Sequence, residues 1–415
     1  MLVGIYFAYS KFSVSKDTEV VRTTVGDFIQ GDIVIGAYID GEYSKTIPGK
    51  NDGYIVDKIV CDNDASASWN NDSWGILVSN LTKRTKCNVY FIVKPVPVSE
   101  KIASAMSNNP DMFASDDPDY NLRYIGANPS NYIYFNCSDY SNQSDSTCEK
   151  WRIIGLFNNV SKSNGTKENL VKIIRDDSLG DYSWDSSDSS VNNGYGVNDW
   201  SAADVMKLLN PGYENESVGG SLYYNAKSGL CYSFWKNQNS SCDFTTNGLK
   251  NDETRNAIEE VVWSLGGTAS YNSSSNGLAS HWYGYERGII VYSGRPMIWT
   301  GKIGLMYPSD YGYATEGSSN ISRTTCLAQE IYNWGSSYND CSINNYLYNS
   351  NNFQLTLTHY SGDASNVIFL YPDGILDFGN AYLNAALRPT LFLKSDITIK
   401  SGTGESSSPY QLNIN

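Results

Sequence analysis

Histidine and the common catalytic motifs are nearly absent from this chain. Only two of its 415 residues are histidine, His281 and His359, and none of its cysteines forms a CxxC pair. A structural zinc site normally needs about four ligands, drawn from histidines and closely spaced cysteines, so no metal site is expected. The chain also lacks a GxSxG elbow, a Walker loop, an HExxH motif and a dinucleotide fingerprint. We therefore predict no catalytic residue, no cofactor and no enzymatic activity.

Charged residues and long apolar runs are scarce as well. Charged residues make up only 18% of the chain, and the formal net charge is -14. A phosphate backbone would be repelled, so nucleic acid is not an expected partner. The apolar run MLVGIYFAYSKF at residues 1–12 is shorter than the roughly 20 residues that span a bilayer. We assign residues 1–28 to the trimmed end of a membrane anchor or to an N-terminal helix or strand, and expect attachment to a membrane at this end only.

Tyrosine and cysteine are well represented. The 32 tyrosines, with abundant serine, asparagine and glycine, are typical of turn-rich β structure on exported proteins. The eight cysteines fall into four local couples: Cys61 with Cys87, Cys137 with Cys148, Cys231 with Cys242, and Cys326 with Cys341. We predict four disulfides formed in an oxidising compartment, with buried free thiols as the alternative.

Turn clusters and apolar patterns divide the chain into two domains. Residues 29–95 contain four candidate strands and predict a small β-sandwich. Residues 96–120 are rich in proline and acidic residues and predict a linker. In residues 121–415, early and late strands enclose helices predicted at 198–212, 251–267 and 324–334. This order of elements favours an α+β domain.

The segment NVIFLYPDGILDFGNAYLNAALRPTLFL, residues 366–393, raises a separate question. Its ends, 366–371 and 389–393, read as strands that would bury Val367, Phe369, Leu391 and Leu393 by alternation. Residues 377–384 between them hold aromatic and amide side chains without any period. Asp373 and Asp377 could suggest glycoside hydrolysis, but Pro372-Asp373-Gly374 is a usual turn sequence.

Three stretches carry a resemblance to a known family. WRIIGLF from Trp151, GRPMIWTGKIGLMYPSDYGYA with its Leu305–Ser309 segment, and ALRPTLFLKSDITIKSGTGESSSPY with Arg388-Pro389 resemble uncharacterised surface proteins of gut Firmicutes and Mollicutes. Their large domain is similar to the formylglycine-generating-enzyme branch of the C-type-lectin-like fold. The resemblance covers about residues 120–410. It implies a C-type-lectin-like domain preceded by a small all-β sandwich domain.

The resemblance does not extend to that enzyme's chemistry. The formylglycine-generating enzyme needs reactive cysteines late in the domain, and no cysteine follows Cys341 here. The related sulfoxide synthases bind iron through three histidines, and this chain has two. The same branch includes ligand-binding proteins that are diversified by retroelements just before the closing strand.

The corresponding place in this chain is residues 354–385, and the resemblance implies a variable binding surface there. Aromatic rings give contact area with few rotors, and asparagine and aspartate adapt their hydrogen bonds. An ordinary surface loop is the alternative. We expect an adhesin for a protein or glycan at the cell surface; a carbohydrate-active hydrolase and a pilus-like structural protein are the other candidates. The predicted ligand-binding residues are His359, Tyr360, Asp363, Tyr371, Asp377, Phe378, Asn380, Tyr382 and Asn384. All but His359 and Asp363 are expected to be largely exposed.

Overall fold

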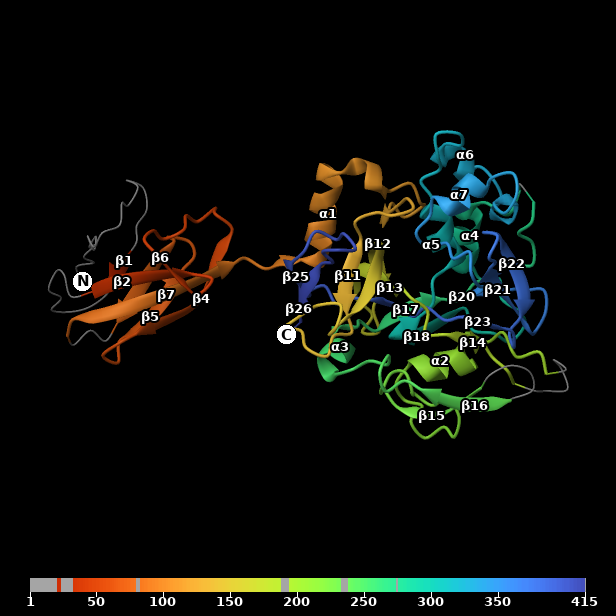
Figure 1. Ribbon diagram of the computed structural model, residues 1–415, viewed down its shortest axis with the longest axis horizontal. Helices are drawn as coiled ribbons and strands as arrows, with labels where there is room; N and C mark the ends of the chain where they lie inside the picture. The colour runs from red at the N-terminus through yellow and green to blue at the C-terminus, as the bar shows by residue number, and fades with distance from the viewer. Residues whose placement is uncertain are drawn as a thin grey trace. The chain divides into compact units, whose positions relative to one another are not determined.

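The computed structural model describes residues 21–23, 33–79, 83–187, 194–232, 238–273 and 275–414. The chain divides into two compact units, residues 1–95 and 96–415, which are described separately below (Figure 1). Helices hold 15% of the residues and strands hold 37%. The protein is therefore mostly β, with short helices placed between strands.

The small unit consists of two sheets around one core. The first sheet has the order β3-β2-β7-β4, and the second has the order β1-β6-β5. Ile35 and Val89 from the first sheet and Ile76 and Val78 from the second are all buried in the same cluster. The strands are β1 Val21–Thr23, β2 Ile33–Ile39, β3 Glu42–Ser44, β4 Tyr54–Cys61, β5 Ser66–Asn70, β6 Gly75–Ser79 and β7 Thr85–Val93. This is the all-β unit that the strand and turn pattern predicted.

The large unit is built on a seven-stranded sheet whose main path is β19-β24-β13-β12-β10-β9, with β11 paired to β12. Strand β12 is long because Trp151, Ile153 and Ile154 are buried, and β13 pairs with it in antiparallel fashion. The strands are β9 Phe113–Ala114, β10 Leu122–Tyr124, β11 Tyr132–Phe135, β12 Glu149–Ser161, β13 Lys167–Arg175, β19 Ile303–Gly304 and β24 Thr390–Phe392.

A five-stranded sheet carries the segment that the sequence singled out. Its order is β14-β23-β20-β21-β22, so β22 is an edge strand. The strands are β14 Asp181–Ser183, β20 Gln354–His359, β21 Asn366–Leu370, β22 Leu376–Asn380 and β23 Asn384–Ala386. Residues 377–384 are therefore not an irregular loop: most of them form the edge strand and the turn that follows it.

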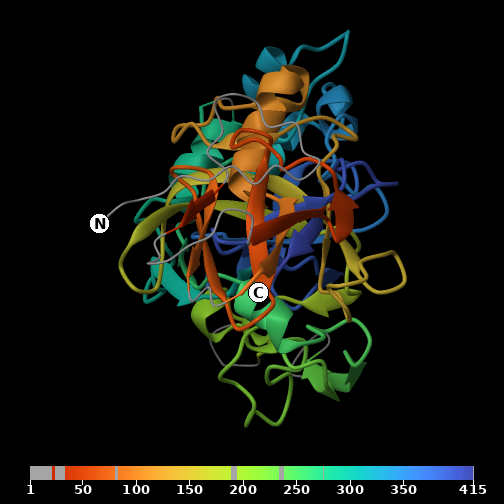
Figure 2. The same cartoon turned by 90° about the vertical axis from the view of Figure 1, so that its left-hand side faces the viewer.

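Smaller sheets and short helices complete the large unit (Figures 1 and 2). A three-stranded sheet, β26-β25-β8, joins the two ends of the unit. The remaining strands are β8 Val96–Pro97, β15 Ser228–Tyr232, β16 Asn239–Asp243, β17 Val261–Ser264, β18 Ile298–Gly301, β25 Thr398–Ser401 and β26 Gln411–Asn413. The helices are α1 Val98–Asn108, α2 Asp204–Leu209, α3 Asp252–Ala257, α4 Ala279–Glu286, α5 Pro308–Tyr313, α6 Arg323–Leu327 and α7 Asn339–Ile343, with 3-10 turns η1 Pro110–Met112, η2 Trp200–Ala202 and η3 Ile331–Asn333.

The predicted linker at residues 96–120 is wrong. This segment contains β8, α1, η1 and β9 and belongs to the large unit. Val98 and Ile102 lie one helical turn apart on α1 and are both buried in the core of that unit. Because the apolar face of α1 is packed in this way, the boundary between the units lies at Pro95 and not along a flexible connection.

The predicted helices are shorter than expected. The helix expected at 198–212 is divided into η2 and α2, and Asp199 is the N-cap of η2. In the segment 251–267, Asn251 caps α3, but the helix ends at Ala257 and β17 follows. The segment 324–334 is likewise divided between α6 and η3. Tertiary strand pairing outweighs helical periodicity after Ala257, since β17 pairs with β18.

All four predicted disulfides are confirmed. Cysteine pairs at disulfide distance join Cys61 to Cys87, Cys137 to Cys148, Cys231 to Cys242 and Cys326 to Cys341. The first joins facing residues of β4 and β7, and the last connects α6 to α7. Four disulfides are typical of an extracellular or secreted protein.

The predicted N-terminal anchor falls almost wholly outside the described residues. Of residues 1–28, only Val21–Thr23 is described, as strand β1 paired in parallel with β6. No helix within the described ranges is both long and apolar enough to cross a bilayer.

Candidate functional site

Four of the predicted binding residues come together at the edge strand β22. The ring of Tyr360, which directly follows β20, stacks on the ring of Phe378 in β22 with centroids 4.8 Å apart. The hydroxyl of Tyr371 donates a hydrogen bond of 3.0 Å to the carbonyl of Phe378. Asp377, the preceding residue in β22, accepts a hydrogen bond from the hydroxyl of Tyr271. The fold thus brings together side chains from β22 and from separate connecting segments of the chain.

Three further aromatic residues complete the group, and sequence reasoning missed them. Tyr271 contacts Tyr360 and Phe378 edge to face, at 6.2 and 6.4 Å, and Tyr332 of η3 contacts Tyr271 at 6.5 Å. Phe353 packs against Tyr371 at 4.6 Å and stands one residue before the segment 354–385. We call this group the aromatic surface: Tyr271, Tyr332, Phe353, Tyr360, Tyr371 and Phe378.

Exposure varies across the aromatic surface. Phe378, Phe353 and Tyr332 are 41%, 40% and 38% exposed, which is enough for each ring to contact a ligand. Tyr360 and Tyr371 are half-buried, while Tyr271 is buried beneath the group. The exposed rings therefore rest on a packed base, and a ligand would meet side chains that are already held in place.

Tyrosine side chains also protect the edge of the sheet. The main-chain N–H of Phe378 donates to Asp377 Oδ1 at 2.8 Å and lies 3.4 Å from the Tyr271 hydroxyl, and its carbonyl accepts from Tyr371. An unprotected edge would pair with strands of other chains. Burial raises the pKa of Tyr271, and the hydrogen bond to Asp377 raises this pKa further. This end of β22 therefore presents ring surface and not free main-chain groups.

The prediction that seven residues are largely exposed is mostly wrong. Only Phe378 and Asn384 are exposed, whereas the others are half-buried: Tyr360, Tyr371, Asp377, Asn380 and Tyr382. The predicted burial of Val367, Phe369, Leu391 and Leu393 is confirmed. In β21, however, this burial does not result from an alternation of buried and exposed residues, because Ile368 and Leu370 on the other face of the strand are buried as well. The sheet is covered on both faces at β21.

His359 and Asp363 do not belong to the surface. His359 is 4% exposed, and its Nε2 accepts a hydrogen bond from the Tyr292 main chain at 3.2 Å. Burial, with a contribution from Arg295, lowers the pKa of His359 to about 4, so the ring is neutral. Asp363 accepts hydrogen bonds from the main-chain N–H groups of Ser365 and Asn366 and builds the turn between β20 and β21. The burial of His359 leaves it no surface for a ligand, whereas the role predicted for Asp363, which is half-buried, stays a prediction.

Asn380, the last residue of β22, forms a second group with Tyr382 and Asn384, which follow the strand. The Tyr382 ring stacks on Tyr195 with centroids 5.8 Å apart, and Tyr195 is 39% exposed. Asn384 lies in β23 and accepts a hydrogen bond of 2.8 Å from the Ser183 hydroxyl. The carbonyl of Asn380 accepts from Leu383 in the intervening turn. The nine predicted residues therefore divide among two surface groups, a turn and the core.

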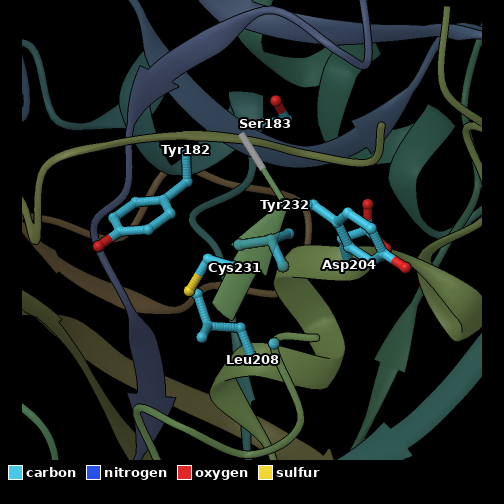
Figure 3. A pocket seen from close by; sticks show the side chains of 8 residues that line it. Tyr182, Ser183, Asp204, Leu208, Cys231 and Tyr232 are labelled. Carbon is cyan, nitrogen blue, oxygen red and sulfur yellow. The ribbon is translucent and has the colours of Figure 1, made fainter. Parts of the chain in front are cut away.

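A small pocket lies elsewhere in the large unit (Figure 3). Its lining comes mainly from β14, α2 and β15, and includes Tyr182, Ser183, Asp204, Leu208, Cys231 and Tyr232. Burial, followed by the neighbouring Asp185, raises the pKa of Asp204 to about 7. Among the described residues that line the pocket, Asp204 is the one carboxylate. Within the described ranges, no three His, Cys, Asp or Glu side chains gather as a metal site would require.

A buried ionic cluster links the main sheet to α5. Lys172 Nζ lies 2.5 Å from Asp310 Oδ2, and Arg123 Nη1 lies 2.9 Å from Asp310 Oδ1. Arg123 Nε also pairs with Asp117 at 2.6 Å. Burial alone would raise the pKa of Asp310, but the two cations outweigh it and lower this pKa to about 2. The ion pairs of Asp310 with Arg123 and Lys172 connect α5 to β10 and β13. The side chains of the cluster are at most 1% exposed, so a substrate cannot contact them.

Comparisons with known proteins do not identify a functional site in this chain. No family model, curated protein or solved structure matches this chain. The aromatic surface at β22 is therefore the strongest candidate site on the geometry of its own residues.

Proposed function

We propose that this chain is an exported bacterial surface protein, held at its N-terminal end, whose large unit binds a protein or glycan ligand through the aromatic surface. The large unit is in this proposal a C-type-lectin-like domain, and residues 354–385 contain its variable binding segment. One observation carries the proposal: exposed rings stand on a buried aromatic base at a protected sheet edge. Apolar side chains that form one contiguous patch on a folded protein often mark an interaction site.

The chemistry of this surface suits both ligand classes. Ring faces stack on the apolar faces of sugars and on apolar protein side chains alike, and tyrosine hydroxyls add hydrogen bonds at the rim. The overall charge of -14 favours neutral or basic ligands over strongly acidic ones.

The test measures binding of the full chain to immobilised mucin, which presents both protein and glycan, and to an array of glycans. The double variant Phe378→Ser with Tyr332→Ser should lose at least about tenfold in affinity, as expected for aromatic anchor residues. Both side chains are partly exposed, so the melting temperature should change little.

Tyr120→Ser is the matched control, because Tyr120 is 75% exposed and lies outside the aromatic surface. Equal loss in the control and in the double variant would contradict the proposal. Unchanged binding in the double variant would contradict it as well, as would a failure of the unmodified chain to bind any probe.

A further inference from the structure

Strand β18 has one unpaired edge. It pairs only with β17 among the described strands, and Ser264 of β17 faces Ile298. Both main-chain groups of Ser264 are hydrogen-bonded to the Tyr307 hydroxyl at 3.0 Å, so they point away from β18. In an antiparallel ladder, facing residues whose main-chain groups point away from each other share no hydrogen bonds, and Ser264 and Ile298 are such a pair. The N–H and C=O of Ile298 consequently point away from β17, to the open side.

The same alternation sends the main-chain groups of Thr300 to the open side. Leu265 donates a hydrogen bond of 2.8 Å to the carbonyl of Met297, which places Met297 and Trp299 on the β17 side. Throughout the described part of the chain, no residue is hydrogen-bonded to the outward groups of Ile298 and Thr300. Both residues are exposed. Two donors and two acceptors on β18 thus face solvent.

This edge lacks the protection that β22 has. Natural edge strands are usually covered, bulged or marked by a charge or a proline. Residues 297–301, MIWTG, contain neither a charged residue nor a proline. At β22 the corresponding groups of Phe378 are capped by tyrosine and aspartate side chains. Pro296 and Lys302 stand just outside this stretch, so the outward main-chain groups of Ile298 and Thr300 remain free to pair with a further strand.

Four exposed aliphatic side chains lie beside this open edge. Ile289, Ile290, Met297 and Ile298 are 80%, 58%, 48% and 60% exposed. The main-chain carbonyl of Ile290 accepts a hydrogen bond from Gly267, and that of Met297 accepts one from Leu265. Because Leu265 and Gly267 are only two residues apart, the segments that carry Ile290 and Met297 lie close together. We call them the aliphatic surface. Apolar side chains gathered in this way mark an interaction site on a folded protein.

We propose that β18 pairs in antiparallel fashion with β18 of a second copy of this chain, around a twofold axis at Trp299. The open edge is self-complementary, because its outward groups lie at Ile298 and Thr300, two residues apart. In the dimer Ile298 faces Thr300 of the other copy, and each of the two symmetric pairs exchanges two hydrogen bonds. The two two-stranded sheets then form one continuous sheet, β17-β18-β18-β17, and each aliphatic surface is brought to the same interface.

The dimer does not depend on the proposed ligand. The aromatic surface is formed by other residues, so ligand binding and self-association should fail separately when either surface is changed. A short ladder and four aliphatic side chains make a small interface, and we expect dissociation constants in the micromolar range.

Sedimentation velocity of the full chain, from about 1 to 300 μM, tests the proposal over the range expected for such an interface. The unmodified chain should pass from monomer to dimer. Ile298→Lys places a charge on the edge, and Thr300→Pro removes an outward donor without touching the bonds to β17. Each should raise the dissociation constant by at least about tenfold. Ile343→Lys is the control, since Ile343 is also an exposed isoleucine, 51% accessible, but lies in α7.

Hydrogen exchange of the unmodified chain gives an independent readout that does not rely on any variant. The amides of Ile298 and Thr300 should exchange rapidly at monomer concentrations and become protected at dimer concentrations. A chain that stays monomeric throughout overturns the proposal. So does a dimer that survives both edge variants, or a dimer in which these two amides exchange as fast as in the monomer.

Discussion

The ionic cluster around Asp310 permits a quantitative prediction. Asp310→Asn keeps the shape of the side chain but removes the charge that Lys172 and Arg123 share. Both cations then remain buried with less compensation: Arg123 keeps Asp117, while Lys172 keeps, among the described residues, the surrounding rings, of which Tyr307 is the nearest at 4.4 Å. Removal of one partner from a buried ion pair costs about 3 to 5 kcal/mol.

Calorimetry of the full chain measures this cost. For a unit of this size, about 3 to 5 kcal/mol corresponds to a melting temperature lower by about 6–10 °C. Lys172→Met is the matched variant, because it removes a cation and leaves Asp310 paired with Arg123. Its loss should be smaller, and the double variant should be more stable than Asp310→Asn alone. A loss below about 1 kcal/mol in Asp310→Asn would refute the reasoning, since desolvation would then not dominate.

The same cluster sets an acid limit on stability. The pKa of Asp310 is lowered from 3.8 to about 2, so the folded state favours its charged form. The resulting stabilisation is complete above pH 4 and is lost as the pH falls from about 4 to about 2. It amounts to roughly 2.5 kcal/mol, and it should be missing from the pH profile of Asp310→Asn.

Three other features lead to further predictions. Non-reducing peptide mapping should return the four local disulfides, and Cys61→Ser with Cys87→Ser should destabilise the small unit by about 2 to 5 kcal/mol; a bridge between different couples would contradict the assignment. Limited proteolysis should cut near Pro95, the last residue of the small unit, and should spare α1, which is packed into the large unit; cleavage within α1 before any cleavage near Pro95 would contradict the packing of α1. Because the pKa of His359 is lowered from 6.5 to about 4, its contribution is present above pH 6.5 and is lost as the pH falls to about 4. His359→Gln should flatten the fall in melting temperature over this range, and an unchanged slope would show that His359 is not the responsible group.

Local signals predicted the strands well and the helices less well. Strands β12 and β13 follow from runs of buried apolar residues, and α3 begins where a helix was expected, at Asn251. The helix expected to continue past Ala257 ends there because Ile258 bridges to Leu393 and β17 pairs with β18. Helix α1 was missed although Val98, Ile102 and Ala105 have helical spacing, since the nearby prolines and acidic residues suggested a linker.

The candidate site was predicted only in part, for a physical reason. Tyr360, Tyr371, Asp377 and Phe378 lie within one segment, so their gathering could be expected from the chain itself. Tyr271 and Tyr332 reach the same place from other turns, through contacts that only the folded chain creates. His359 is the last residue of β20, whose six residues are all buried, whereas Tyr360 lies just beyond the strand and is half-buried.

The sheet β26-β25-β8 has a mechanical consequence. Strands β8 and β26 lie on either side of β25, so the first and the last strand of the large unit are about 10 Å apart. Tension applied between residues 95 and 414 would act on this small sheet before any other part of the unit. Strand β8 is held by only two paired residues, Pro97 to Thr398 and Val96 to Ile399. Pulling should therefore detach β8 and α1 first, while the sheet that carries the aromatic surface stays unloaded and able to hold its ligand.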